Sequence, residues 1–383
     1  MHAPHDSLAH RYRPEFPIFR EKVYLNSCSL GALSERVVRA LAAFTDQWSA
    51  RGASAWYDVW LDAIERLRAR YAALIGAAPA ELAFAPSISG ALTTLASALD
   101  FARRPKVVVA ELDFPTVAHQ FLAKRRLGVE VVFVPSDDGL TVDLARYEEA
   151  VDERTAAVVT SHVFFTTGAV QDAAAIGAIA RRRGALSVID AYQSIGQAPF
   201  DAKAAGVDAA CGGALKWLLG GPGLAFLYVR SDLVPELEPT AASWFGVQDP
   251  FAFDSRAFRL REDAARFELG TPALAAVYAA GAGLEVIEEV GVPRIRERVS
   301  GLVDDLVARA SAAALRVRVP ARREARSGIV RIERDDPAAD VDRLAARGIV
   351  CDHRTGAVRV SPHFYNTVED NEAVVAALAG AAR

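Results

Sequence analysis

The amino-acid sequence predicts an α/β protein built on a mostly parallel, seven-stranded sheet that helices cover on both faces. From about residue 83 onward, short apolar runs alternate with segments whose apolar residues recur every three to four positions. The first pattern is typical of buried strands and the second of helices. Their regular alternation is typical of a parallel sheet wrapped by helices. A chain of 383 residues is long enough for two domains and a large core.

The elements of this sheet follow a short strand at residues 23–26 and two helices at residues 34–48 and 56–75. The seven strands are predicted at residues 83–86, 107–110, 129–134, 156–161, 186–189, 207–211 and 224–229. A helix should follow the first of them, and others are expected near residues 116–126, 142–151 and 172–183. The last strand comes too soon after a glycine-rich turn for a helical crossover, so we expect it to be antiparallel.

The C-terminal part of the chain changes pattern and predicts a smaller α+β unit. It begins with a helix at residues 272–290, which has Pro272 in the first-turn position that proline favours. Strands are expected at residues 315–319, 327–332, 349–352 and 358–361, with helices at residues 340–347 and from 369 onward. We therefore predict an N-terminal arm (1–30) packed with the small domain, a large domain (31–271) and a C-terminal part (272–383).

Composition limits the partners of the chain. Hydrophobic residues make up 52% and charged residues 24%, as in ordinary soluble enzymes. A net charge of -4 argues against nucleic-acid binding through phosphate neutralisation. No apolar run approaches the roughly 18 residues of a membrane helix. The N-terminus lacks the basic and apolar regions of a secretory signal. We therefore expect a cytoplasmic protein without a membrane or nucleic-acid partner.

The three cysteines, Cys28, Cys211 and Cys351, are scattered along the chain and lack the spacing of metal ligands. Free thiols in a reducing compartment are the expected state. No metal site is predicted.

Two charged residues next to apolar runs point to a cofactor. Lys216 lies in a glycine-rich turn, and Asp190 ends a run that reads as a buried parallel strand. A lone lysine would normally extend its ammonium into water, but strand ends in open α/β sheets hold ligands. Pyridoxal phosphate (PLP) needs such a pair, because an amine forms a Schiff base with its aldehyde and a carboxylate keeps its pyridine nitrogen protonated.

The segment Ser87-Ile88-Ser89-Gly90 is a candidate phosphate site at the predicted start of a helix. Small residues there expose backbone amides and hydroxyls where the helix dipole favours an anion. A plain helix cap by Ser87 or Ser89 is the alternative interpretation.

Several motifs occur in an order that resembles one enzyme family. They are Asp113-Phe114-Pro115-Thr116, Ser161-His162-Val163, the run from Asp190 to Gly196, the run from Lys216 to Gly220, Trp244-Phe245-Gly246, Gly270-Thr271-Pro272, the run from Gly348 to Asp352 and the run from Arg359 to Thr367. Together they resemble the class V aminotransferase group of fold type I PLP enzymes. That group includes kynureninases, cysteine desulfurases, selenocysteine lyases and isopenicillin N epimerase-like proteins.

The resemblance implies a fold type I PLP-dependent transferase fold, a homodimer with composite active sites, and a role for each matching residue. Lys216 would form the Schiff base, Asp190 would bind the ring nitrogen, and Gln193 would lie near the ring hydroxyl. Phe114 would stack on the ring, and Ser89 would bind phosphate together with Thr271 of the other subunit. Further cofactor-binding candidates are Ser87, Ile88, Thr116, His162 and Trp244. Arg359 would clamp the substrate carboxylate, with Asn26 and Ser29 as further substrate-binding candidates. His162 is equally compatible with an ordinary core position.

Some residues differ from those of the family members named above, and these differences limit the reactions that the chain can be expected to catalyse. Kynureninases resemble one another in having histidine at the position of Gln193 and tyrosine at that of Leu215, so these residues argue against kynurenine as substrate. Cys351 is the only C-terminal candidate for the thiol of a desulfurase, but its predicted strand favours a buried thiol.

The functional hypothesis is a PLP enzyme that acts on an α-amino acid, with cleavage of a β-substituent as first choice. Desulfuration, kynureninase-type hydrolysis, transamination and epimerisation remain open. In each case Lys216 would take the α-proton, which requires that burial near other cations lower its pKa. A PLP-sensing regulator would need a DNA-binding unit, for which the N-terminus has neither the length nor the basic charge.

Overall fold

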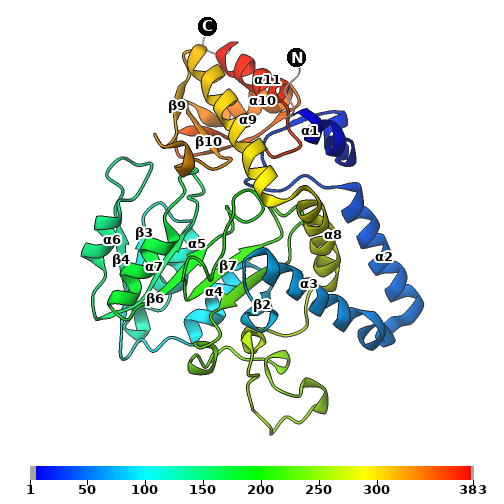
Figure 1. The fold of residues 1–383 in the computed structure, drawn as a ribbon, viewed down its shortest axis with the longest axis vertical. Helices are drawn as coiled ribbons and strands as arrows, with labels where there is room; N and C mark the ends of the chain where they lie inside the picture. The colour runs from blue at the N-terminus through cyan, green and yellow to red at the C-terminus, as the bar shows by residue number, and fades with distance from the viewer. Residues whose placement is uncertain (1–5, 381–383) are drawn as a thin grey trace.

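The computed structural model describes residues 6–380, and the predicted seven-stranded sheet lies at its centre (Figure 1). The strands are β2 (Leu82–Ala85), β3 (Lys106–Ala110), β4 (Glu130–Val134), β5 (Thr155–Ser161), β6 (Leu186–Asp190), β7 (Ala209–Gly213) and β8 (Ala225–Val229). Their order is β2-β8-β7-β6-β5-β3-β4. The five strands from β7 to β4 run parallel, and β8 is antiparallel to both of its neighbours. The predicted mostly parallel sheet and its antiparallel strand are confirmed.

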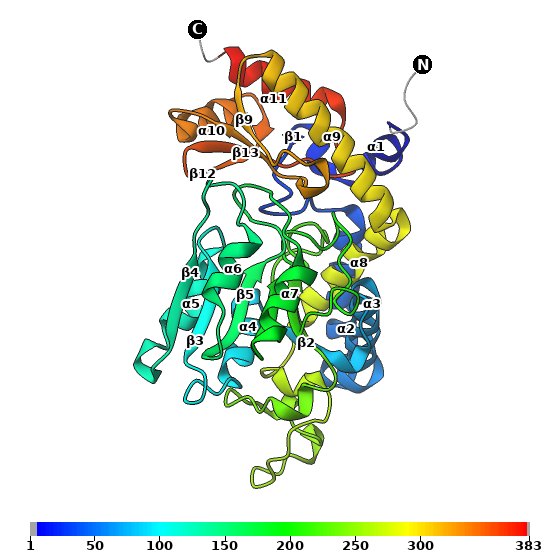
Figure 2. The same cartoon turned by 60° about the vertical axis from the view of Figure 1, so that its left-hand side comes forward.

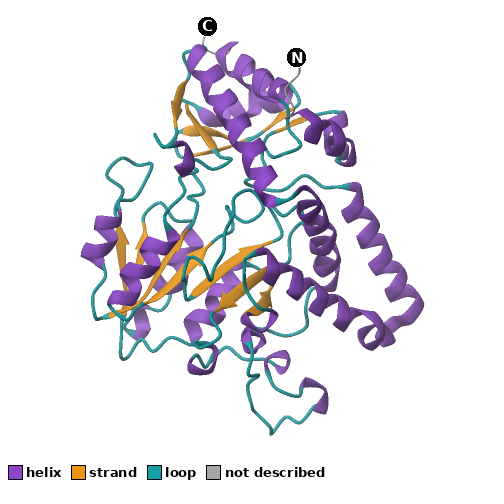
Figure 3. Ribbon diagram, in the orientation of Figure 1, coloured by secondary structure: helices purple, strands orange, loops and turns teal. Residues whose placement is uncertain are grey.

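Helices cover both faces of the sheet (Figure 3). They include α4 (Ile88–Ser97) and α5 (Pro115–Leu122) on one face and α6 (Leu144–Ala150) and α7 (Ala173–Arg182) on the other. Alternate residues of β3 enter different cores, because side chains of a strand point to opposite faces. Val107 and Val109 pack with α4 and α5, whereas Val108 packs in the cluster that contains α6 and α7. This double burial explains why the strands read as continuous apolar runs.

Three long helices support the turn that carries Lys216. They are α2 (Glu35–Arg51), α3 (Leu61–Leu74) and α8 (Leu274–Val290). The helix α8 packs against α2 and α3 and also touches the turn that follows β7. A Cβ atom on Gly283 would lie 2.5 Å from the carbonyl oxygen of Leu218, so only glycine permits this approach. Close helix packing therefore fixes the backbone next to Lys216.

The C-terminal unit lies above the carboxyl ends of the central strands and includes the start of the chain (Figure 2). Its elements are a four-stranded sheet of β12 (Asp352–Arg354), β13 (Ala357–Val360), β10 (Val330–Glu333) and β9 (Arg316–Arg318), and the helices α9 (Val292–Ala312), α10 (Pro337–Ala346) and α11 (Val368–Ala379). After α1 (Asp6–Tyr12), the strand β1 (Val23–Tyr24) pairs in parallel with β11 (Ile349–Val350). The division at residues 30 and 271 stays a prediction, and residues 1–5 and 381–383 lie outside the described residues.

Two sequence predictions in this region were wrong. The sequence predicts no helix or strand in residues 291–314, yet residues 292–312 form α9. Its apolar stripe, which includes Ile295, Val299 and Leu302, has helical spacing, but Gly291 and Pro293 obscure the start of the helix. Pro272 was expected in the first turn of the preceding helix, but α8 begins two residues later, at Leu274.

Residues 242–260 protrude from the lower end of the molecule in Figures 1 and 2. Within residues 6–380, no helix combines the length and the apolar character that crossing a bilayer would require.

Candidate active site

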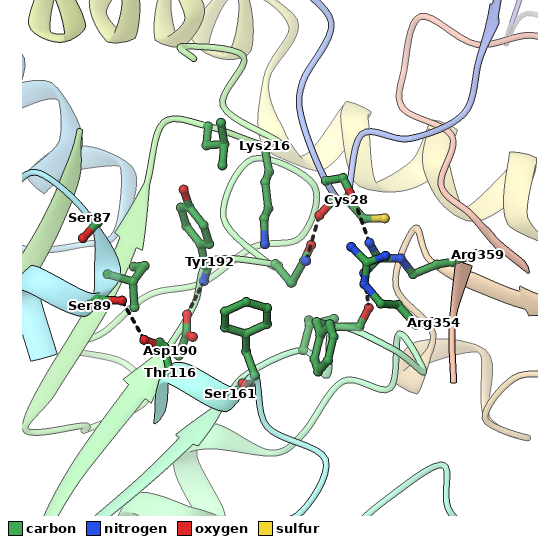
Figure 4. A pocket seen from close by; sticks show the side chains of 17 residues that line it. Cys28, Ser87, Ser89, Thr116, Ser161, Asp190, Tyr192, Lys216, Arg354 and Arg359 are labelled. Atoms are coloured by element: carbon green, nitrogen blue, oxygen red, sulfur yellow. Dashed lines mark hydrogen bonds between the residues drawn. The ribbon is translucent and has the colours of Figure 1, made fainter. Parts of the chain in front are cut away.

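A cavity of about 350 Å³ opens between the carboxyl ends of the central strands and the C-terminal unit (Figure 4). Segments from most of the chain meet there. Its lining consists of Cys28, Ser29, Ser87, Ile88, Ser89, Phe114, Thr116, Ser161, Val163, Phe165, Asp190, Tyr192, Gln193, Leu215, Lys216, Arg354 and Arg359. Ten of the fourteen predicted site residues are in this lining.

Asp190 is the last residue of β6, and only 5% of it is exposed. Its Oδ1 accepts a hydrogen bond from the backbone N–H of Tyr192 at 2.9 Å. Burial raises the pKa of Asp190, although the Tyr192 amide and the Lys216 ammonium oppose this effect. Within residues 6–380, Asp190 forms no ion pair. A buried carboxylate without a directly bound cation is costly, so Asp190 is suited to bind a cationic ligand atom.

Lys216 follows β7 and extends into the cavity (Figure 4). Its Nζ lies 4.4 Å from the ring centroid of Tyr192 and 5.8 Å from that of Phe114. Burial lowers the pKa of Lys216 from 10.5 to about 8; Arg359 adds to this effect, and Asp190 opposes it. In the described part of the chain, the ammonium forms no ion pair. A lysine with this pKa is partly neutral near physiological pH, as a nucleophile or a base requires.

This lowered pKa predicts a pH-dependent stability of the cofactor-free protein. Below pH 8 the buried Lys216 ammonium destabilises the fold by about 3 kcal/mol. The reason is that Lys216 binds its proton more weakly in the folded chain than in the unfolded chain. As the pH rises from about 8 to 10.5, the unfolded chain binds more protons than the folded one, so stability increases. Lys216→Met should therefore stabilise the cofactor-free protein at pH 7, and this gain should vanish near pH 10.5. Denaturant unfolding at both pH values measures the difference, and a gain that is independent of pH would contradict the prediction.

The start of two helices forms one end of the cavity. Ser87 caps α4 by accepting the Gly90 N–H at 3.2 Å, so the predicted cap interpretation is also correct. Ser89 in the first turn of α4 lies 2.6 Å from Thr116 in the first turn of α5, measured between their hydroxyl oxygens. Two helix N-termini and two hydroxyls at one point suit a phosphate group.

Farther along the cavity, an aromatic ring and a side-chain amide form part of the wall. The ring of Phe114 is 44% exposed and meets Phe165 edge-on, with centroids 5.1 Å apart. Gln193 donates from Nε2 to the Cys28 carbonyl at 2.9 Å and accepts the Trp217 indole N–H at 2.9 Å. Because Trp217 fixes the amide orientation, the remaining N–H of Gln193 is available to a ligand oxygen.

Arg359 on β13 forms the opposite end of the cavity, and only 2% of it is exposed. Its Nε and Nη2 donate to the two carboxylate oxygens of Asp352 at 2.9 and 2.7 Å. Nη2 also donates to Ser29 Oγ at 2.7 Å, and Nη1 donates to the Phe165 carbonyl at 2.6 Å. The expected arginine is in place, but with a protein carboxylate already bound.

Four predicted site residues lie outside the cavity lining. The ring of His162 packs on Phe200 with centroids 5.2 Å apart, and burial lowers its pKa to about 4. Asn26 forms a backbone bridge with Ser361. Trp244 lies in the protruding segment, and Thr271 is exposed.

The structure also adds residues to which the sequence interpretation gave no role. Tyr192, Phe165 and Arg354 line the cavity. Tyr192 could have been found, because it follows Asp190 by two positions. Arg354 depends on the β12–β13 hairpin, whose register the sequence does not reveal.

Comparison with known proteins identifies the family. The model of the family described as aminotransferase class-V matches residues 23–374. A Bacillus subtilis protein named "Uncharacterized aminotransferase YcbU" is 38% identical over 95% of this chain and 96% of its own. A "Probable cysteine desulfurase" of Methanothermobacter thermautotrophicus is 33% identical over 78% of this chain and 75% of its own. A kynureninase of Pseudomonas fluorescens is 31% identical over 91% and 86% of the two chains.

Solved structures share the fold. The apo cysteine desulfurase of Thermococcus onnurineus has a TM-score of 0.88 at 23% identity and covers 100% of this chain and 98% of its own. A C-DES mutant with glycine covalently linked to its PLP cofactor also has a TM-score of 0.88, at 21% identity, with 96% and 98% covered. The predicted fold and family are both confirmed, and the chain belongs to the aminotransferase class-V family.

Proposed function

We propose that this chain is a PLP-dependent enzyme that acts on an α-amino acid. The observation that carries the proposal is the pair Lys216 and Asp190. Both line one cavity, and neither has an ion-pair partner among the described residues. A buried amine and a buried carboxylate that both lack an ion-pair partner at contact distance are expected where a ligand supplies the missing partners.

The remaining lining fits PLP from end to end. Ser89 and Thr116 would hold the phosphate, Asp190 the ring nitrogen and Gln193 the ring hydroxyl, and Phe114 would cover one ring face. When bound to Lys216, PLP supplies an electron sink that makes the bonds at the α-carbon of an amino acid easier to break. This assignment uses hydroxyls, a carboxylate, an amide and an aromatic ring, each in the role that its chemistry favours.

The chain's own residues then perform three tasks. Arg359 anchors the substrate carboxylate, which fixes the α-carbon relative to Lys216. Nζ of Lys216, with a pKa of about 8, takes and returns the α-proton. Phe114 and Phe165 shield this region from water, since their rings meet at the cavity wall.

Cleavage of a β-substituent, such as a carbon–sulfur bond, is the reaction that we favour. One relative is named as a probable cysteine desulfurase and another as a kynureninase. Gln193 and Leu215 stand in this chain where kynureninases, by the family resemblance, have histidine and tyrosine. The described thiols Cys28, Cys211 and Cys351 are all buried. Burial raises the pKa of Cys351 to about 12, so this thiol is unsuited to carry sulfur to another protein. Direct release of the β-substituent therefore fits better than a relay through a cysteine persulfide.

Transamination is the second candidate, because the 38% identical relative is named as an aminotransferase. A substrate panel separates the two. The PLP-loaded protein is incubated with S-methylcysteine, cysteine, selenocysteine, kynurenine and alanine, and pyruvate, sulfide, anthranilate and amino transfer to a keto acid are measured. Pyruvate and thiol in equal amounts from S-methylcysteine support the lyase. Amino transfer without any released β-substituent would contradict it.

The role of Arg359 gives a separate prediction. Arg359→Ala should raise KM for the amino-acid substrate about 100-fold, because a charge-assisted anchor is lost, while the Kd for PLP changes little. Arg331→Ala is the matched control, since Arg331 lies directly opposite Arg359 on β10 but does not line the cavity. Steady-state kinetics and PLP titration measure both effects. An equal loss of PLP binding and substrate binding in Arg359→Ala would contradict the anchor role.

We also propose a cytoplasmic homodimer in which Trp244 and Thr271 reach the cavity of the other subunit. In one subunit neither residue lines the cavity, and Trp244 is 40% exposed on the protruding segment. The cluster of Trp244, Phe251 and Phe253 gives this segment an apolar surface suited to a partner subunit. Sedimentation analysis tests the dimer, and a monomer with full activity would contradict the composite site.

A further inference from the structure

The hydrogen bonds of Arg359 leave it little capacity for a substrate. A guanidinium has five N–H donors. Four of them are used, two by Asp352, one by Ser29 and one by the Phe165 carbonyl. One donor remains, whereas a carboxylate held in the usual two-point geometry needs two. Arg359 alone is therefore insufficient while these bonds persist.

Arg354 lines the same cavity and has the capacity that Arg359 lacks (Figure 4). Its Nη1 donates to the His353 carbonyl at 2.6 Å, and its Nη2 lies 3.2 Å from Oδ2 of Asp352. These contacts leave three of its five donors unused. Its side chain is 41% exposed, against 3% for that of Arg359, so it is also freer to adjust to a ligand.

Asp352 connects the two arginines. The antiparallel register of β12 and β13 places Asp352 directly opposite Arg359, where cross-strand pairs interact most strongly. The Ser29 hydroxyl donates to Asp352 as well. Burial raises the pKa of Asp352, but the bonds and charge of Arg359, Ser29 and Arg354 outweigh this effect and lower it, so the carboxylate stays ionised. Two guanidiniums and one carboxylate give a cluster with a net charge of about one, which suits a single carboxylate ligand.

We propose that Asp352 is a positioning residue that combines Arg354 and Arg359 into one two-arginine site for the substrate carboxylate. It fixes Arg359 through two bonds and keeps Arg354 beside it. Arg354 then contributes unused donors, and Arg359 contributes its remaining one. The inference rests on the proposed function, because it assumes an amino-acid substrate whose carboxylate enters this end of the cavity.

Because Asp352 is charged, its replacement by asparagine changes the affinity for an anion in opposite directions under the two possible roles of this residue. If Asp352 only neutralised charge, Asp352→Asn would raise the net charge of the cluster and tighten the binding of an anion. If it positions the arginines, the same change would loosen both and weaken anion binding. A general loss of structure would affect amine and amino-acid ligands alike.

The experiment compares two small probes, L-alanine and ethylamine, which differ only in that ethylamine has a hydrogen atom in place of the carboxylate. Spectral titration of the PLP-loaded protein gives the Kd of each. Asp352→Asn and Arg354→Ala should each raise the Kd of L-alanine about 10- to 100-fold, with that of ethylamine within about twofold. Arg354→Lys should recover part of the affinity. Arg316→Ala, an exposed arginine on the same sheet, should change neither Kd.

Two results would overturn the proposal. One is an Asp352→Asn protein that binds L-alanine as tightly as the unmodified protein, or more tightly. The other is an Arg354→Ala protein that behaves like Arg316→Ala, and this variant also covers the case in which Asp352→Asn does not fold. If the unmodified protein itself bound L-alanine no more tightly than ethylamine, the carboxylate site and the proposed function would fail together.

Discussion

Replacing Lys216 with alanine is expected to abolish turnover, by about 1,000-fold or more, and to remove the visible absorption of the PLP-loaded protein. Alanine has neither the amine that binds the aldehyde nor the base that takes the α-proton. No other lysine substitutes for it, because the chain has five lysines and Lys216 is the only one in the cavity lining. Absorption spectra and initial rates with the best substrate of the panel measure the two losses.

The control for this variant is Lys203→Ala. Lys203 is half exposed and pairs with Glu81 at 2.8 Å, away from the cavity. Its replacement should leave the spectrum and the rate unchanged. Folding should not explain the loss in Lys216→Ala, because removal of a buried charge stabilises the cofactor-free protein near pH 7. A Lys216→Ala protein that keeps its absorption band would refute the cofactor assignment.

Asp190→Asn should lower kcat about 100-fold or more while the protein remains folded. The carboxylate at the end of β6 would keep the ring nitrogen protonated, and a neutral amide cannot balance that charge in a buried site. Loss of a buried charge partner commonly costs about 3–5 kcal/mol, which corresponds to about 100- to 4,000-fold. Single-turnover rates and the absorption spectrum of the loaded variant test this expectation.

Asp208→Asn is a matched control for Asp190→Asn. Asp208 is equally buried, accepts the Ser187 N–H at 2.8 Å and pairs with Arg230 at 2.6 Å, but it does not line the cavity. Its replacement should reduce the free energy of unfolding by about 1–3 kcal/mol and leave kcat unchanged. If both variants lost kcat in proportion to their loss of stability, Asp190 would be a structural residue only.

The sequence was sufficient to predict the central sheet because burial on both faces leaves a clear signal. Strands such as β3 and β5 are buried at every position and have an unbroken apolar run at their centre, and the helices between the strands keep a regular spacing. The sequence did not predict α9. Its 21 residues are rich in charge, and its start is marked by Gly291 and Pro293, which usually indicate a turn or loop rather than a helix. The glycine and the proline at its start therefore hid the helical periodicity of its apolar residues.

For the site, the residues next to strand ends and helix starts were predictable, but the contacts between distant segments were not. Lys216, Asp190 and Ser89 each follow a local rule. The partners of Arg359 do not, because Ser29 lies 330 positions away and the Phe165 carbonyl 194 positions away. Asp352 and Arg354 acquire their importance only through the register of the β12–β13 hairpin. Such long-range pairings depend on the tertiary fold.

Every role proposed for the cavity depends on covalent binding of PLP by Lys216. The most direct test is to load the protein with PLP, reduce the Schiff base with borohydride, digest the protein and locate the added pyridoxyl group by mass spectrometry. We expect a single modified peptide that contains Lys216, and no modification in the Lys216→Ala protein. Modification of another lysine, or no stable modification after loading, would contradict it.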